Sequence, residues 1–256
     1  MLRTTMGKAL PPIDISYIAD RLDDISDDLE HAYDEALDAE GPEPRVLLEG
    51  MRRLIDTMRA ADAGPPAQFS ERLQKSTGSD PEVLLEHGLR LLTQLSDLAA
   101  QLNLPHHAEH VEQLCLPLAC WLLRRGAELQ HPEPVVNAAA HIANGLKSPT
   151  ELAELFGLLS EVMNGIGIER ALELESSSPE RPWRVLLLNR AIVATRSHQP
   201  ALMEEAFQSV VEHLREDAPD FFREGMGQME SLDYPLQVRE VMQRYFDVWC
   251  VGQKLH

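Results

Sequence analysis

The chain of 256 residues lacks the features that mark secreted, membrane-spanning or nucleic-acid-binding proteins. Its three cysteines are too few for a disulfide framework, which is typical of a reducing compartment. The longest apolar run, residues 114–123, contains Pro117 and falls far short of the roughly 20 residues that span a bilayer. Residues 1–10 have no apolar core of a secretory signal. These absences predict a soluble cytoplasmic protein with no membrane partner.

Basic residues are scarce. The chain has 23 Lys and Arg against 42 Asp and Glu, and a formal net charge of −19. Such a charge repels phosphate backbones, so nucleic acid is not expected as a partner. Much of the excess lies between Asp14 and Glu43, where Arg21 is the one Lys or Arg. A solvated helix face is the favoured interpretation. The alternative is that this segment imitates nucleic acid and binds a basic protein.

Aromatic residues are also few, at 5% of the chain, while Leu, Ala and Glu abound. The sequence has no Asn-Gly or Asp-Gly hairpin signal and no alternating β-branched runs. Its apolar content of 44% is sufficient for a buried core. Together these features predict an all-α protein, because Leu, Ala and Glu favour helix over sheet.

One helix pattern occurs twice, 37 residues apart. Residues 44–49 read Pro-Arg-Val-Leu-Leu-Glu, and residues 81–86 read Pro-Glu-Val-Leu-Leu-Glu. A proline suits the first helical position, where its missing N–H has no intrahelical partner to lose. Two copies of one amphipathic helix indicate stacked units that bury their apolar faces against each other.

A second match, offset by 35, pairs residues 200–208 with residues 235–243. We therefore predict antiparallel helical hairpins stacked as an α-solenoid, with a compact multi-helix bundle as the alternative. The predicted regions are an acidic amphipathic helix at 1–43, hairpins at 44–175 and C-terminal hairpins at 179–256. We expect these regions to form one continuous array, joined near Ser176–Pro179.

Residues 182–249 carry signs of a known repeat class. A Trp-x-x-Leu opening, an alanine, an apolar residue at an aromatic position and a closing proline occur in order: Trp183, Leu186, Ala206, Val210 and Pro219. In this respect the segment resembles the tetratricopeptide class of helical-hairpin repeats, although Leu187 and Arg190 stand where that class keeps glycine and tyrosine. The resemblance implies stacked hairpins that bind a protein or peptide, and it implies no catalytic residue.

The first predicted helix, about residues 14–39, carries a narrow apolar stripe with spacings of three and four. Its members are Ile15, Ile18, Leu22, Ile25, Leu29, Ala32 and Ala36. We expect the stripe to pack on the rest of the chain, since three heptads are marginal for a free coiled coil. The alternative is a homodimer through this helix.

A histidine cluster lies at the start of the most apolar helix, predicted from Pro105 to about Leu129 with a kink at Pro117. His106 and His110 are four residues apart, and with Glu109 they could share a metal on one helix face. A metal-dependent enzyme or metal sensor is therefore an alternative function. The other interpretation is that these side chains are the polar start of a buried helix. Phosphate-loop, dinucleotide-binding and nucleophile-elbow motifs are absent, so no cofactor is predicted.

The C-terminal hairpins concentrate methionine and aromatic residues, which peptide grooves use as adaptable anchors. The candidate partner-binding residues are Phe221, Phe222, Met226, Met229, Met242 and Tyr245. The same residues at helical spacing also suit a core. Because no catalytic set converges, the predicted function is a non-catalytic interaction module or scaffold for a protein or peptide partner.

Overall fold

The computed structural model describes residues 9–36, 41–167, 170–171, 173 and 181–251. Over these ranges the regular structure is helical and contains no strand, so the all-α prediction is confirmed. None of the helices in the described ranges is both long enough and apolar enough to cross a membrane. The predicted joint at Ser176–Pro179 lies entirely outside these ranges.

The described residues pack as two compact units. Unit 2 contains residues 11–36, 41–144, 161–167 and 170–171, and unit 1 contains 9–10, 145–160, 173 and 181–251. The division passes through the end of α7 (Glu133–Gly145) and through α8 (Pro149–Ile166).

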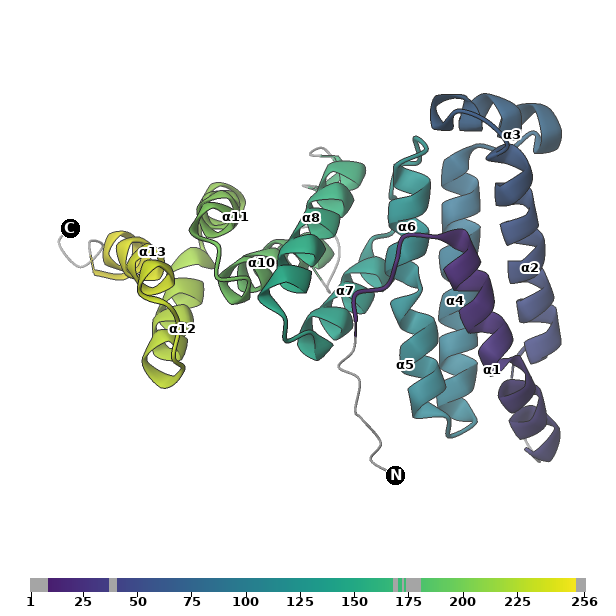
Figure 1. Cartoon of the computed structure of the whole chain (residues 1–256), viewed down its shortest axis with the longest axis horizontal. Coiled ribbons are helices and arrows are strands. Elements are labelled where there is room, and N and C mark those ends of the chain that lie inside the picture. The colour runs from purple at the N-terminus through teal and green to yellow at the C-terminus, as the bar shows by residue number, and fades with distance from the viewer. Residues whose placement is uncertain (1–8, 37–40, 168–169, 172, 174–180, 252–256) are drawn as a thin grey trace. The chain divides into compact units, whose positions relative to one another are not determined.

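Unit 2 is built around long helices that run alongside one another, with a short helix across one end (Figure 1). Its elements before α7 are α1 (Ile15–Glu35), α2 (Pro44–Ala61), η1 (Pro66–Gln68), α3 (Phe69–Thr77), α4 (Pro81–Gln101), α5 (Pro105–Gln113) and α6 (Cys115–Leu123). The stripe of α1 faces inward over most of its length, since Ile15, Ile18, Leu22, Ile25 and Leu29 are at most 7% exposed. Ala32 is half-buried, and Ala36 is exposed and follows the end of the helix, which was predicted to reach residue 39; residues 37–40 lie outside the described ranges. The α1 helix contacts α2, α5 and α6, so helices of the same chain cover this stripe.

The two matching sequences form α2 and α4, which lie in contact. Both helices begin at the repeated proline, and both bury the paired leucines that follow it. The valines at matching positions, Val46 and Val83, are 62% and 56% exposed. The repeat therefore specifies the same buried face twice, because equal apolar spacing on a helix selects equal sides.

The apolar helix expected from Pro105 to about Leu129 divides into α5 and α6. The α5 helix ends at Gln113 and α6 begins at Cys115, with Leu114 between them. Pro117 causes this division, because it has no N–H for the carbonyl of Gln113, four residues earlier. The prediction of an interruption near Pro117 is therefore confirmed. The prediction of one kinked helix ending near Leu129 is wrong, because there are two helices and the second ends at Leu123.

Unit 1 contains the first part of α8 and two helical hairpins. These are α10 (Pro182–Arg196) with α11 (Pro200–His213), and α12 (Ala218–Ser231) with α13 (Leu236–Phe246), followed by the π-helical turn η2 (Asp247–Val251). The helices of each hairpin contact each other, and α11 also contacts α13. The 35-residue match thus corresponds to two hairpins of the same kind.

Aromatic rings fill the core between the hairpins of unit 1. The centroid of the Phe207 ring lies 5.2 Å from the ring centroids of Phe222 and Tyr245 and 5.7 Å from that of Phe221. Each of these pairs is edge-to-face. Such pairs each add about 0.5–1.5 kcal/mol beyond the area they bury. The cluster therefore fixes α11, α12 and α13 against one another.

Arg190 of α10 is the most deeply buried charged residue in the part of the chain that the structure describes, with only 1% of it exposed. Its guanidinium stacks on the Phe156 ring at 4.2 Å, donates to Ser160 Oγ at 2.9 Å and pairs with Glu205. Burial lowers the pKa of this guanidinium, and the neighbouring Glu205 carboxylate opposes that shift. The buried charge ties α8 to α10 and α11 inside unit 1.

Candidate functional site

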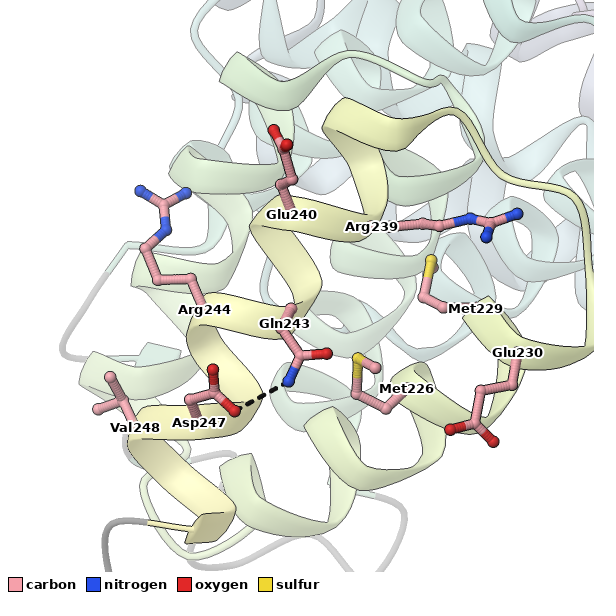
Figure 2. A pocket seen from close by; sticks show the side chains of 9 residues that line it. All are labelled: Met226, Met229, Glu230, Arg239, Glu240, Gln243, Arg244, Asp247 and Val248. Carbon is pink, nitrogen blue, oxygen red and sulfur yellow. Dashed lines mark hydrogen bonds between the residues drawn. The ribbon is translucent and has the colours of Figure 1, made fainter.

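The last hairpin places two methionines and a row of charged side chains around one surface groove, here called the α12–α13 groove (Figure 2). It is lined by Met226, Met229 and Glu230 of α12, by Arg239, Glu240, Gln243 and Arg244 of α13, and by Asp247 and Val248 of η2. Its volume is about 720 Å³. This is within the range of sites that enclose a small molecule or several partner side chains.

A glycine lets the two helices approach behind the groove. A Cβ at Gly225 would lie 2.6 Å from Met242 Cε, closer than two carbon atoms can pack. Met242 therefore packs directly on the α12 backbone and is only 2% exposed. Small residues at such crossings bring helix axes together and leave larger neighbours to line the surface beside them.

Methionine and valine form the apolar part of the groove. In Figure 2 the side chains of Met226 and Met229 extend from α12 toward α13. Met229 is 4% exposed, whereas Met226 is half-buried and Val248 is 61% exposed. Met226 and Val248 are thus the apolar side chains of this groove that a partner could contact, whereas Met229 is buried.

The two arginines of the groove already have acidic partners outside it. Arg239 donates to an Asp233 carboxylate oxygen at 3.0 Å and to the Tyr234 carbonyl at 2.8 Å. Arg244 of α13 pairs with Glu204 of α11. Both arginines of the groove are therefore already ion-paired with carboxylates of the same chain.

The three acidic residues of the groove are not compensated in this way. Glu230 and Glu240 form no hydrogen bond or ion pair with any part of the chain that the structure describes. Asp247 accepts a hydrogen bond from Gln243 Nε2 at 2.8 Å, which is drawn in Figure 2, but has no cationic partner there. The groove therefore presents three carboxylates that form no ion pair with a described residue, beside two arginines that pair with carboxylates outside its lining.

Glu204 also holds Tyr245 beside the groove. The Tyr245 hydroxyl donates to Glu204 Oε2 at 3.1 Å. Burial, followed by the charge of Glu204 and this hydrogen bond, raises the pKa of Tyr245 to about 12. The phenol therefore stays neutral and donates its hydrogen bond to Glu204, whose carboxylate also forms the ion pair with Arg244.

Unit 2 has a groove of nearly the same size, about 710 Å³, here called the α2–α4 groove. It is lined by Glu30, Arg45, Val46, Glu49, Gly50, Arg52, Arg53, His87 and Leu91. Its arginines form pairs with carboxylates: Arg45 with Glu30 at 2.7 Å, Arg53 with Glu49 at 2.8 Å and Arg52 with Asp23 at 3.0 Å. Opposite charges in this groove are thus matched within the chain.

The predicted partner-binding residues divide between core and surface. Phe222, Met229 and Met242 are at most 4% exposed, and Phe221 and Tyr245 are half-buried in the aromatic cluster. Met226 remains as the predicted residue that is both accessible and part of the groove. Helical spacing placed these residues on the inner face, but it could not show which of them the neighbouring helix covers.

The predicted metal residues His106, Glu109 and His110 all lie on α5. His106 and His110 are exposed, and Glu109 accepts a hydrogen bond from Gln113 at 3.2 Å. Across the described ranges, no group of three or more His, Cys, Asp or Glu side chains is arranged to hold a metal ion.

Three other histidines each meet a carboxylate from a different helix or segment. His107 Nε2 lies 2.8 Å from Asp28 Oδ2, His131 Nδ1 lies 2.7 Å from Glu86 Oε2, and His141 Nδ1 lies 2.8 Å from Glu112 Oε2. These contacts connect elements of unit 2. They explain the abundance of histidine here as contacts between helices.

The acidic helix α1 is only partly compensated. Asp23, Asp28 and Glu30 contact basic side chains of α2 and α5. Asp20, Asp27 and Asp34 recur every seven residues and form no ion pair or hydrogen bond with a described residue. The α1 helix thus carries a second set of three exposed carboxylates on one helix face, of which Asp34 also interacts with the charge of Arg45.

Comparisons with protein-family models, with curated proteins and with solved structures found no significant match for the chain. Sequence reasoning found the methionines of the groove but missed Glu230, Glu240 and Asp247. A signal for two of these was present, because Glu240, Gln243 and Asp247 recur at helical spacing. The third, Glu230, joins them only through the packing of α12 on α13.

Proposed function

We propose that this protein is a non-catalytic interaction module that binds a segment of a partner protein in the α12–α13 groove. The observation that carries the proposal is the accessible apolar pair Met226 and Val248 beside uncompensated carboxylates in a groove of about 720 Å³. Burying one methionine side chain contributes about 1.5–3 kcal/mol, and its flexible thioether adapts to different partners.

The aromatic cluster supports this function by holding the groove in place. Phe207, Phe222 and Tyr245 lock α11, α12 and α13 together, so the lining residues project from a rigid hairpin. A preformed groove loses little conformational entropy on binding, which favours recognition through a small apolar anchor.

A photo-crosslinking experiment tests the proposal in the cells that make the protein. A photoreactive phenylalanine analogue replaces Val248 in the full chain, and as a matched control it replaces Val83, which is 56% exposed on α4. We expect a discrete protein adduct from position 248, reduced at least tenfold by Met226→Gln, and none from position 83. Equal adducts from both positions, or an adduct insensitive to Met226→Gln, would remove the groove from consideration.

The stacked-hairpin architecture also remains a proposal. It is supported by matched helices in both units and by the contact of α11 with α13. A compact chain of this length has a radius of gyration of about 18 Å. Small-angle scattering should give a clearly larger value if the hairpins form a superhelix, and a value near 18 Å would favour the bundle.

A further inference from the structure

The chemistry of the α12–α13 groove narrows the class of partner. Glu230, Glu240 and Asp247 line it and form no ion pair with a described residue, while Arg239 and Arg244 of the same lining pair with Asp233 and Glu204. An apolar partner without charge would bring these carboxylates toward a drier surface and leave them unpaired. Burial of an unpaired charge is strongly unfavourable, so such a partner fits poorly.

A basic partner resolves this conflict. Lysine or arginine side chains flanking an apolar residue could reach the carboxylates while the apolar residue contacts Met226 and Val248. Charged hydrogen bonds of this kind are stronger than neutral ones. They also orient the segment, because the carboxylates come from both α12 and the α13–η2 side of the groove.

We propose that the occupant of the groove is a Lys- or Arg-bearing protein segment with one apolar anchor. A second copy of this chain is disfavoured as the occupant, because each copy has a formal net charge of −19. The α2–α4 groove is of similar size but has its arginines and acids paired, so it lacks this preference. The inference rests on the proposed function and adds the charge of the partner to it.

A selection experiment with defined variants tests the inference. A random peptide library is selected on the full chain, and peptides that also bind the Met226→Gln variant are discarded. The remaining peptides are measured by fluorescence anisotropy against two triple variants. One is Glu230→Gln, Glu240→Gln and Asp247→Asn in the groove, and the other is Asp20→Asn, Asp27→Asn and Asp34→Asn on α1.

The two triple variants are matched, because each removes three carboxylates that form no ion pair with a described residue. Any loss due only to reduced total charge is therefore equal in both. We expect enrichment of Lys and Arg around one apolar residue. Affinity should fall at least tenfold for the groove variant and less than threefold for the α1 variant. The groove loss should shrink at high salt, because salt screens exposed charges.

The remaining outcomes separate the two levels of the proposal. Selected peptides that are neutral or acidic would overturn the basic-partner inference and leave the groove as a binding site. A larger loss in the α1 variant would overturn it in favour of the acidic helix as the basic-protein surface. Failure to obtain any peptide that distinguishes the wild type from Met226→Gln would overturn the proposed function itself. Circular dichroism melting of each variant verifies that the fold is retained.

Discussion

The two units carry grooves of almost equal volume, about 720 and 710 Å³, yet they treat their charges differently. In the α2–α4 groove of unit 2, each arginine meets a carboxylate from the same or a neighbouring helix. In the α12–α13 groove of unit 1, the arginines are drawn to acids outside the lining and three carboxylates remain. The two grooves therefore agree in size and differ in how their charged side chains are paired, and the proposed function depends on this difference.

The same contrast extends to buried groups. Unit 2 pairs its partly buried Arg125 with Asp62 through two hydrogen bonds of 2.8 and 2.9 Å, and the guanidinium of Arg125 lies 3.3 Å from the centroid of the Trp121 ring. Unit 1 buries Arg190 more completely, but its acidic partner Glu205 has a side chain that is 58% exposed. Five experiments test this difference between the two units.

Thiol labelling should give the largest difference between the units. Cys115 and Cys120 of unit 2 are 1% and 0% exposed, and burial raises the pKa of both thiols, that of Cys120 to about 12. Cys250 of unit 1 is partly exposed. In single-cysteine variants at pH 8, Cys250 should react with a disulfide reagent at least about 100-fold faster, because buried thiols must wait for opening. Similar rates would show that α6 opens readily.

Truncation of Arg190 should cause the next largest effect. Arg190→Ala removes the stem that packs on Phe156 and the hydrogen bond to Ser160, so it should lower the free energy of unfolding by about 3 kcal/mol. Arg190→Met keeps most of the volume and leaves Glu205 in water, so it should cost about 1 kcal/mol or less. Urea unfolding measures both. Equal losses would mean that the charge, not the packing, provides the stability.

Removal of the acidic partners should affect stability differently at the partly buried Arg125 and at the buried Arg190. Asp62→Asn breaks a two-pronged pair whose side chains are 13% and 28% exposed, and should cost about 2 kcal/mol. Glu205→Gln should cost less than about 1 kcal/mol, because solvent already screens its exposed carboxylate. Thermal melts of the two variants test the order. A larger loss for Glu205→Gln would show that the Arg190 pair depends on full charge.

The raised pKa of Tyr245 leads us to expect a lower free energy of unfolding at alkaline pH. Its folded-state pKa, about 12, lies above the value of roughly 10 expected for an unfolded tyrosine. Its contribution is therefore complete below pH 10 and is lost as the pH rises to about 12. Because Tyr245 is partly exposed, screening limits this contribution to about 1 kcal/mol. Urea unfolding at pH 9 and pH 11 should show a smaller decrease for Tyr245→Phe than for the wild type.

The smallest effect concerns the grooves themselves. Neutralising Glu230, Glu240 and Asp247 should raise the free energy of unfolding by about 0.5 kcal/mol, because repulsion within an acidic protein falls. Neutralising Glu30, Glu49 and Asp23 should instead lower the free energy of unfolding slightly, since three exposed ion pairs are lost. Changes of the same sign in calorimetry would contradict the distinction between the two grooves.

Several features of this molecule follow from local patterns. The spacing of Leu47, Leu48 and Leu54, and of their matches 37 residues on, is sufficient to predict two helices with the same buried face. Pro117 is sufficient to predict an interruption, because the missing N–H acts within one turn. The metal hypothesis used the same kind of local pattern, but three ligands must also converge in space, which spacing along α5 does not determine.

Local sequence patterns are thus sufficient to predict the helical class, the starts of the repeated helices, their apolar faces and the excess of acid. They do not predict which methionine stays accessible or which carboxylates form no ion pair, because these properties depend on contacts between distant residues. Helical periodicity acts over a few residues, whereas Arg125 pairs with Asp62 across 63 positions and Arg244 with Glu204 across 40. Packing between helices therefore decides where charge and apolar surface remain for a partner.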